Sequence, residues 1–423
     1  MHFSSRTLAA ALLCSLLPPV AASPVWAAVP AVARQTTAAP ATAKTTTAQQ
    51  SATQSVQTYD LHFHPENGVK ESLPLDNQQV AYYAYRNLVY VAHPRNPEYE
   101  QMNLFVPAAY LEGKTVNGYT AKTAPIFLPN NVGGSMPGKA GNPSDKSHSD
   151  GPNTMLVALS KEYVVASPAV RGRSTTDARG SYVGKAPALI VDYKAAVRYL
   201  RHNANRLPAG DTEKIISNGN SAGGALSALL GATGNSPDYE PYLKELGAAE
   251  ERDDIYASMD YCPITDLSRI DWLKIRDGKV VSMDLAKYAV YATRLKPAPA
   301  FDRLDGSSGE NDEFGTETNQ PRHFSTFGFQ NRTDKNPMAP AEAIRMLSPL
   351  EYIGKAPVTL AEHWRIRHGE VDRDTALPVP AILALKLQEA GKDVDFATVW
   401  GKGHAGDYDL EDLFAWMDRI GHE

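Results

Sequence analysis

Cysteine is scarce in this chain of 423 residues, which contains only Cys14 and Cys262. We expect Cys14 to be removed with its segment, so no disulfide framework or cysteine-based metal site can form. His62 and His64 form an H-x-H pair, but alternation along a strand face explains them without a metal. The protein must therefore be stabilised by a hydrophobic core alone, which this length permits, and we expect neither a metal nor another cofactor.

An excess of basic residues is also lacking. The chain has 42 Lys and Arg against 48 Asp and Glu, and only three basic residues and no acidic residue precede position 60. The body is therefore more acidic than the net charge of −6 indicates. Nucleic acids and anionic lipids require basic patches, so we expect neither as a partner.

Long hydrophobic runs are missing except near the N-terminus, where residues 8–17 are apolar or small apart from one serine. A membrane-spanning helix needs about 20 apolar residues, so stable membrane insertion is not expected. The run, the short basic segment before it and the small residues at 25–27 predict a signal peptide over 1–27. Cleavage there makes the protein secreted or periplasmic. Lipidation of Cys14 is disfavoured because Leu13 is large.

Residues 28–57 are rich in Ala, Thr and Gln and have little apolar content. Such a composition cannot offset the entropy of ordering, so it predicts a flexible linker. From residue 58 to 423 the pattern is that of a globular domain. Residues 264–347, rich in Asp, Gly, Pro, Phe and Arg, interrupt it as a long insertion between two late strands, and insertions of that length are usually functional.

Apolar runs and amphipathic segments alternate through the rest of 58–423. This alternation predicts a mainly parallel sheet with helices on both faces. The expected strands are 81–91, 102–106, 124–128, 163–167, 214–218, 254–259, 358–366 and 394–399, and the expected helices are 192–203, 221–230, 381–390 and 410–420.

The strongest motif is G-x-S-x-G at Gly219–Gly223, between an expected strand and an expected helix. In this context the motif predicts a nucleophile elbow. The sharp turn exposes the hydroxyl of Ser221, and side chains at either glycine would collide with neighbouring backbone. The positive end of the helix dipole favours the negative charge that develops there.

Chain order predicts the partners of this serine, since the fold places an acid and then a histidine after it. His404 follows the last expected strand and is the candidate general base. The loop after the penultimate strand offers three carboxylates, of which Asp372 is the first choice for the acid and Asp374 the second. A buried carboxylate there would orient the imidazole and stabilise its protonated form.

An oxyanion hole needs two backbone N–H donors. Ala222, directly after the nucleophile, is expected to supply one of them. The second should come from the loop after an early strand, and Gly133 and Gly134 fit because glycine lets the backbone approach the oxyanion closely.

These segments resemble the bacterial tannases of the α/β-hydrolase superfamily, from about Tyr83 to the C-terminus. The resemblance rests on the sequences at 221–227, 367–374 and 403–404 and on the insertion. It implies an α/β-hydrolase fold in which the insertion over about 264–347 is a lid, and a triad of Ser221, Asp372 and His404.

The resemblance also implies a substrate class, the galloyl esters. Family members bind the ring hydroxyls through a Lys and a Glu of the lid and the second Asp of the acid loop, which correspond here to Lys296, Glu310 and Asp374. The implied activity is hydrolysis of a phenolic ester through an acyl-enzyme. Two alternatives stay open: a feruloyl or other carboxylesterase of the same fold, and a non-catalytic binding protein on a hydrolase fold.

Overall fold

A nine-stranded mixed sheet forms the centre of the computed structural model, which describes residues 58–146, 151–265, 272–275, 279–282, 293–296 and 300–423. The segments predicted as signal peptide and linker, 1–27 and 28–57, lie outside these residues. In space the strands follow the order β1-β2-β3-β5-β4-β6-β7-β10-β11. Their bounds are β1 (Val69–Leu75), β2 (Gln78–Val89), β3 (Gln101–Pro107), β4 (Pro125–Pro129), β5 (Val164–Pro168), β6 (Asp211–Asn220), β7 (Ala257–Tyr261), β10 (His363–Gly369) and β11 (Asp393–Val399).

Strand direction divides this sheet into two parts. From β5 to β11 in spatial order all strands are parallel, whereas β1, β2 and β3 pair antiparallel with their neighbours. Every residue of β4, β5, β7 and β10 is buried. Burial on both sides is what parallel strands covered by helices require, and it explains the largely apolar sequences of β4 and β5.

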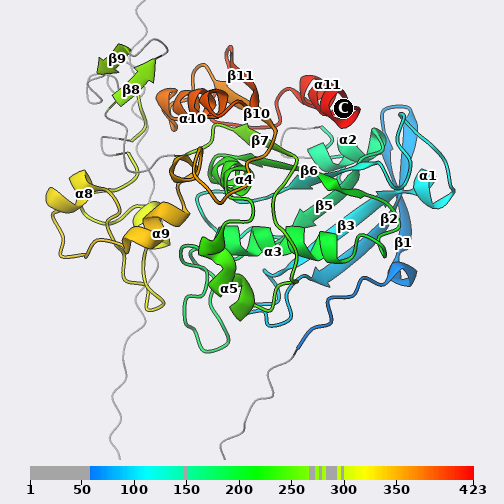
Figure 1. The fold of residues 1–423 in the computed structure, drawn as a ribbon, viewed down its shortest axis with the longest axis horizontal. Helices are drawn as coiled ribbons and strands as arrows, with labels where there is room; N and C mark the ends of the chain where they lie inside the picture. Colours follow the sequence, from blue (N-terminus) through cyan, green and yellow to red (C-terminus); the bar gives the residue numbers. More distant parts are fainter. Residues whose placement is uncertain (1–57, 147–150, 266–271, 276–278, 283–292, 297–299) are drawn as a thin grey trace, which may run out of the picture. The chain divides into compact units, whose positions relative to one another are not determined.

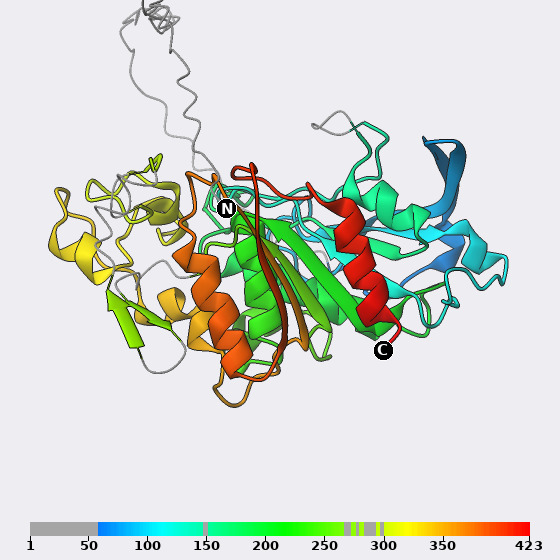
Figure 2. The same cartoon turned by 90° about the horizontal axis from the view of Figure 1, so that it is seen from above.

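Helices cover both faces of the parallel part. Figures 1 and 2 show α2 and α11 on one face and α3, α4 and α10 on the other, and the contacts α2·α11 and α3·α4 agree with this arrangement. Within the described residues no helix combines the length and apolar character needed to cross a bilayer. The helices are α1 (Ala108–Leu111), α2 (Thr154–Ser160), α3 (Ala188–His202), α4 (Ala222–Ala232), α5 (Glu240–Glu245), α7 (Gly309–Glu313), α8 (Thr326–Gln330), α9 (Ala341–Met346), α10 (Pro378–Glu389) and α11 (Leu410–Gly421), with 3-10 turns η1 (Pro65–Asn67), η2 (Pro237–Tyr239) and η3 (Pro349–Glu351).

The segment between β7 and β10 differs from the rest of the fold. It contains the hairpin β8 (Trp272–Ile275) and β9 (Lys279–Ser282) and the short helices α7, α8 and α9. Figure 1 shows these helices, in yellow, beside the sheet rather than within its layers. The segment has a small apolar cluster of its own, formed by Phe301, Phe314, Phe324 and Ala339. It is therefore a separately packed part of the chain.

Most expected elements are present, and two strands are displaced. The expected strand 254–259 is observed as β7, because Asp254 bonds to arginines at the edge of the sheet instead of joining it. The expected strand 358–366 starts only at His363, since the chain first bridges Gly234 through Thr359. The sequence analysis missed β1, whose side chains are exposed or half-buried and therefore leave no apolar run.

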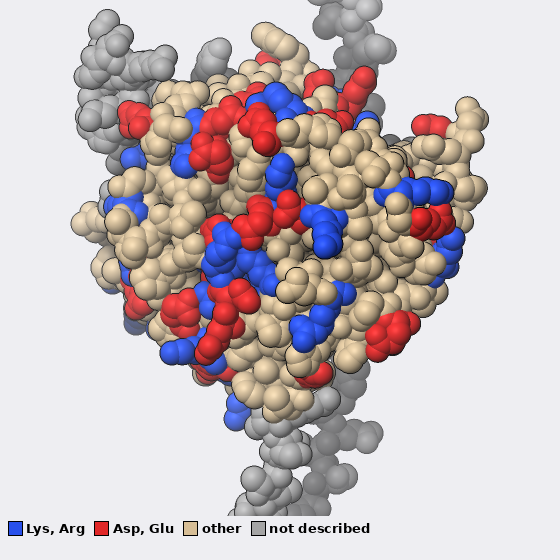
Figure 3. All heavy atoms as spheres, turned by 45° about the vertical axis from the view of Figure 1, so that its right-hand side comes forward, with Lys and Arg blue, Asp and Glu red and all other residues tan. Residues whose placement is uncertain are grey.

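Charges are interspersed on the surface. On the face shown in Figure 3, Lys and Arg lie beside Asp and Glu instead of gathering into patches of one sign. Among the described residues many charged groups form ion pairs, such as Arg86 with Glu71 and Arg252 with Asp254. On this face, charges of opposite sign therefore lie close enough to offset one another.

Candidate active site

The G-x-S-x-G motif forms the tight turn between β6 and α4. Ser221 has φ 59° and ψ −120°, a strained conformation for a residue with a side chain. A Cβ at Gly219 would collide with the carbonyl of Gly223, and one at Gly223 would collide with the side chain of Asn130. The glycines therefore allow β6 and α4 to approach closely enough to hold Ser221 in the turn.

Ser221, His404 and Asp372 form a continuous hydrogen-bonded chain. The Nε2 of His404 lies 2.8 Å from the Oγ of Ser221, and its Nδ1 lies 2.9 Å from Oδ2 of Asp372. Asp372 follows β10 and His404 follows β11, which are neighbouring parallel strands. The two loops therefore leave the same edge of the sheet. The structure thus brings together the three residues that the sequence predicted, with Asp372 rather than Asp374 against the imidazole.

The acid is held as a carboxylate. Its side chain is fully buried, and burial alone would raise the pKa of Asp372. The hydrogen bond and charge of His404 and the backbone N–H groups of Thr375 and Asp374, at 2.9 and 2.8 Å from Oδ1, outweigh burial and lower that pKa. Asp372 therefore stays ionised and keeps a hydrogen on Nδ1 of His404.

The pKa of His404 is shifted in the opposite direction. Burial lowers it, but the hydrogen bond to the ionised Asp372 and the charge of that group, with a further contribution from the neighbouring Cys262, outweigh burial and raise the pKa above its ordinary value. Since Nδ1 faces the carboxylate, Nε2 is left to accept the proton of Ser221. This is the arrangement of a general base beside a nucleophile.

Two neighbours of the triad escaped the sequence analysis. His368, on β10, has its Nδ1 3.8 Å from Asp372, yet burial lowers the pKa of His368 to about 4, so it stays neutral. The Sγ of Cys262 donates to Oδ1 of Asn220 at 3.0 Å. Potential ligand atoms of Cys262, Asp372 and His404 all lie within 4.8 Å of one another. Both ring nitrogens of His404 already have partners in the triad, so a metal here would replace triad bonds.

The expected oxyanion loop lies against the elbow. Asn130, at the end of β4, donates from Nδ2 to the carbonyls of Asn218 and Gly223, both at 3.0 Å, and accepts from the N–H of Val132 at 3.2 Å. Ala222 is the first residue of α4, so its N–H has no partner within the helix. Asn130 therefore fixes the start of the loop that carries Gly133 and Gly134, a role that the sequence analysis missed.

An arginine connects this loop to α7. Arg173 donates from Nε to the carbonyl of Gly134 at 3.0 Å and from Nη1 to Asp312 at 2.8 Å. The other oxygen of Asp312 accepts from Nζ of Lys185 at 2.5 Å. A single carboxylate in the segment between β7 and β10 thus joins two loops of the sheet domain.

The three residues assigned to the ring hydroxyls fall into two groups. Nζ of Lys296 lies 3.1 Å from Oδ1 of Asp374 and 4.6 Å from the centre of the Phe301 ring. Glu310 instead lines a small cavity of about 60 Å³, together with Ala222 and other residues. Among the described residues, no hydrogen bond or ion pair links Glu310 to the Lys296–Asp374 pair.

Arg294 explains how the acid loop is supported. Its Nη1 donates to the carbonyls of Asp372 and Thr375 at 3.0 and 2.8 Å, and its Nη2 donates to the carbonyl of Asp374. The backbone N–H of Leu295 also donates to the carbonyl of Arg373 at 2.9 Å. Arg294 and Leu295, which precede β10, thus fix the loop that carries Asp372. No sequence motif indicated this support.

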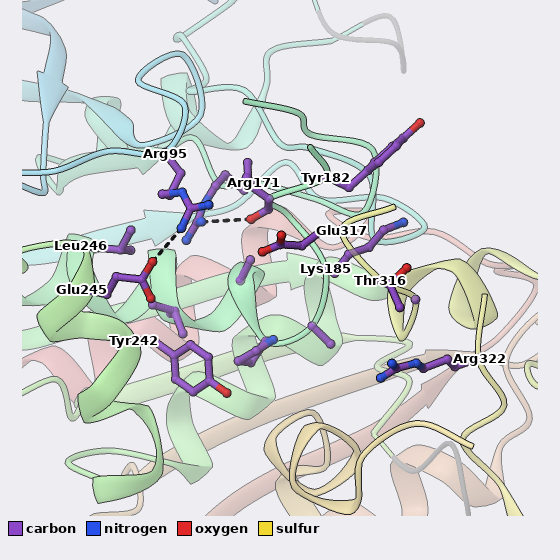
Figure 4. A pocket seen from close by; sticks show the side chains of 16 residues that line it. Arg95, Arg171, Tyr182, Lys185, Tyr242, Glu245, Leu246, Thr316, Glu317 and Arg322 are labelled. Carbon is purple, nitrogen blue, oxygen red and sulfur yellow. Dashed lines mark hydrogen bonds and ion pairs between the residues drawn. The ribbon is translucent and has the colours of Figure 1, made fainter. Parts of the chain in front are cut away.

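A second cavity, of about 380 Å³, is lined by Arg95, Lys185 and Thr316 among other residues (Figure 4). In it the side chains of Arg95 and Glu245 point toward one another and are paired at 2.6 Å, while Arg171 donates to the carbonyl of Val183. None of the three triad residues lines it. This cavity is therefore larger than the one beside Ala222 but contains no nucleophile.

Comparisons with known proteins agree with this site. The family model described as BD-FAE matches residues 135–289. A tannase from Fusobacterium nucleatum is 37% identical, with a TM-score of 0.80 over 86% of this chain and 100% of that one. The tannin acyl hydrolase of Lactobacillus plantarum is 36% identical, with a TM-score of 0.77 over 85% and 98% of the two chains. A tannin acyl hydrolase in complex with ethyl gallate is also 36% identical, with a TM-score of 0.76 over the same shares. Among curated proteins, no sequence match is found.

Proposed function

Because this chain belongs to the bacterial tannases, which are carboxylic ester hydrolases with an α/β-hydrolase fold, we propose that it hydrolyses galloyl esters through an acyl-enzyme. The observation that carries this proposal is the chain of hydrogen bonds from Asp372 through His404 to Ser221. Such a chain activates a serine hydroxyl that would otherwise be a weak nucleophile.

The reaction proceeds in two stages. Ser221 Oγ attacks the ester carbonyl while Nε2 of His404 takes its proton, and the same nitrogen then returns the proton to the leaving alcohol. Water, deprotonated in turn by His404, hydrolyses the acyl-enzyme. Asp372 stays ionised and stabilises the imidazolium. The N–H groups of Ala222 and of Gly133 or Gly134 receive the negative charge of the tetrahedral intermediates, an effect that can exceed 100-fold per donor.

The acyl group is selected by charged side chains near the acid loop. Lys296 and Asp374 form a pair that offers both a donor and acceptors to adjacent ring hydroxyls, and Glu310 supplies further acceptors from α7. A related protein binds ethyl gallate. Substrates without the hydroxyls would leave these groups without partners, and such a site can discriminate by about 10⁴-fold. The segment between β7 and β10 acts as a lid that carries Lys296 and Glu310.

The enzyme is exported. The N-terminal pattern of a short basic segment, residues 8–17 and small residues at 25–27 supports removal of the first 27 residues. The mature protein is then secreted or periplasmic. N-terminal sequencing of protein recovered from the cell envelope or medium tests this, and an intact Met1 there would refute it.

A substrate panel tests the activity itself. Methyl gallate, methyl benzoate, methyl ferulate and phenyl acetate are hydrolysed by the wild type and by Lys296→Ala, Glu310→Ala and Asp374→Ala. We expect a large preference for gallate in the wild type that collapses in the variants. A preference for ferulate, or none, would replace the galloyl assignment by the feruloyl or general carboxylesterase. Equal losses on all esters in the variants would assign these residues to the fold.

A further inference from the structure

Glu313, the last residue of α7, is a buried carboxyl group with no hydrogen-bond partner in the part of the chain that the structure describes. Its side chain is 2% exposed, and neither Oε1 nor Oε2 has a hydrogen bond within the described residues. It lines the cavity of about 60 Å³ that Ala222 and Glu310 also line. Leaving a buried polar group unsatisfied is costly, so a native carboxyl in this position indicates a partner that enters from the cavity.

The surroundings of Glu313 are mostly apolar. Apart from Ser135, the other lining residues are apolar, such as Leu189, Leu226, Ile264 and Phe314. Apolar walls with few polar groups are typical of pockets that bind a small organic group in a fixed orientation. Because Ala222 is the residue after the nucleophile, the cavity opens next to the position of the scissile carbonyl. We assign a group held in it to the acyl side of the ester, because Glu310, assigned above to the galloyl ring, lines the same cavity.

The charge state of Glu313 determines what it can bind. Burial raises the pKa of Glu313 to about 8, although Lys185 and Arg173 act to lower it, while Asp312 and Glu310 on the same helix raise it further. Lys185 and Arg173 are both paired with Asp312, which limits their effect. At neutral pH the group is therefore a carboxylic acid, with one O–H donor and acceptor lone pairs.

We propose that Glu313 is a specificity-determining residue whose carboxylic acid hydrogen-bonds a phenolic hydroxyl of the acyl ring. This inference rests on the proposed function and adds a contact beyond Lys296, Glu310 and Asp374. A phenol is itself a donor and an acceptor, so it can satisfy both oxygens of the neutral acid. A ring without that hydroxyl leaves the carboxyl unsatisfied and is bound less well.

The test uses two variants and one matched control. Glu313→Leu removes the polar group, Glu313→Gln keeps a neutral donor and acceptor, and Glu317→Gln alters an exposed residue of the same segment that lines the other cavity. Each is assayed with methyl gallate and methyl benzoate at pH 7. We expect Glu313→Leu to lose about 10- to 100-fold in kcat/KM on gallate with little change on benzoate, Glu313→Gln to stay near the wild type, and Glu317→Gln to be unchanged.

A pH series provides the second measurement. Between pH 7 and pH 9 the wild type should lose about tenfold in apparent affinity for gallate, because the acid loses its donor proton, and Glu313→Gln should not. Ionisation of the substrate is common to both enzymes and cancels in their ratio. Labelling of Ser221 by a fluorophosphonate verifies that each variant is folded. If Glu313→Leu does not fold, the role of Glu313 is tested by the ratio of the apparent affinities of the wild type and Glu313→Gln for gallate between pH 7 and pH 9.

The outcomes separate this inference from the proposed function. A wild type without preference for gallate over benzoate overturns both. A wild type that prefers gallate, with Glu313→Leu equally impaired on both esters or on neither, overturns only the role of Glu313. If the apparent affinity for gallate depends on pH in the same way in the wild type and in Glu313→Gln, the role of Glu313 is also overturned. An internal water would then be the partner of the carboxyl group.

Discussion

The sheet domain and the segment between β7 and β10 hold their functional groups by different means. Ser221, Asp372 and His404 follow the carboxyl ends of the parallel strands β6, β10 and β11, so the topology of the sheet brings them to one edge. Lys296 and Glu310 lie in a segment of short helices and loops. That segment depends on individual side chains, such as Asp302, which accepts from His323, Ser325 and two further backbone or side-chain donors. The geometry of the triad thus follows from strand order, whereas the residues proposed to select the acyl group are held by specific side-chain contacts.

The largest loss of activity should come from a substitution in the sheet domain. We expect Ser221→Ala to reduce kcat by about 10⁶-fold on every ester, because the nucleophile is needed whatever the acyl group. Circular dichroism should remain that of the wild type, since Ser221 has no capping bond to α4. Retained turnover, with a fluorophosphonate still attached to another serine, would refute the elbow as the site.

The next effect separates the two carboxylates of the acid loop. Asp372→Asn should cost about 10⁴-fold in kcat even on phenyl acetate, because the imidazole loses its orientation and its counter-charge. Asp374→Asn, whose side chain pairs with Lys296 instead, should spare phenyl acetate and impair methyl gallate. If Asp374→Asn is the more damaging change on acetate, the two roles are exchanged.

An intermediate effect tests the link between the two regions. Arg294→Ala removes the donors that hold three carbonyls of the acid loop, and small misplacements of catalytic groups can cost about 10²-fold. We expect kcat on phenyl acetate to fall by about 10- to 100-fold. Arg303→Ala serves as the control, because that exposed side chain bonds only Asp305 within the described residues. Equal activities of Arg294→Ala and Arg303→Ala would show that the acid loop keeps its conformation without Arg294.

The smallest effect concerns the pH profile. His404 acts as a base only when neutral, so kcat/KM should fall as the pH decreases through the raised pKa of His404. Cys262 contributes to that rise. Cys262→Ala should therefore move the acid limb of the profile to lower pH while leaving the plateau almost unchanged. An acid limb at the wild-type position would show that Asp372 alone sets the pKa.

The sequence predicted the first region far better than the second. The elbow motif and the order of strands predict Ser221 and His404 and place the acid in one loop, where Asp372 is the first choice and Asp374 the second. These predictions depend only on a local turn and on the order of parallel strands. Arg294 and Asn130 were not predicted, because they donate hydrogen bonds to backbone carbonyls. Side chains of many types can do this, so no sequence motif marks such a contact. Glu313 was not predicted, because burial of a carboxyl group depends on the packing around α7. The strand β1 was not predicted, because it is held mainly by its backbone pairing with β2 and has no apolar run.

Asp312 has a consequence for how the enzyme responds to its substrate. Through Arg173 this carboxylate is connected to the carbonyl of Gly134, and it is one residue away from Glu313. Under the proposed function, a ring bound against α7 contacts the same short helix that Arg173 connects to the oxyanion loop. A poorly fitting ring is then expected to weaken the chemistry as well as the binding.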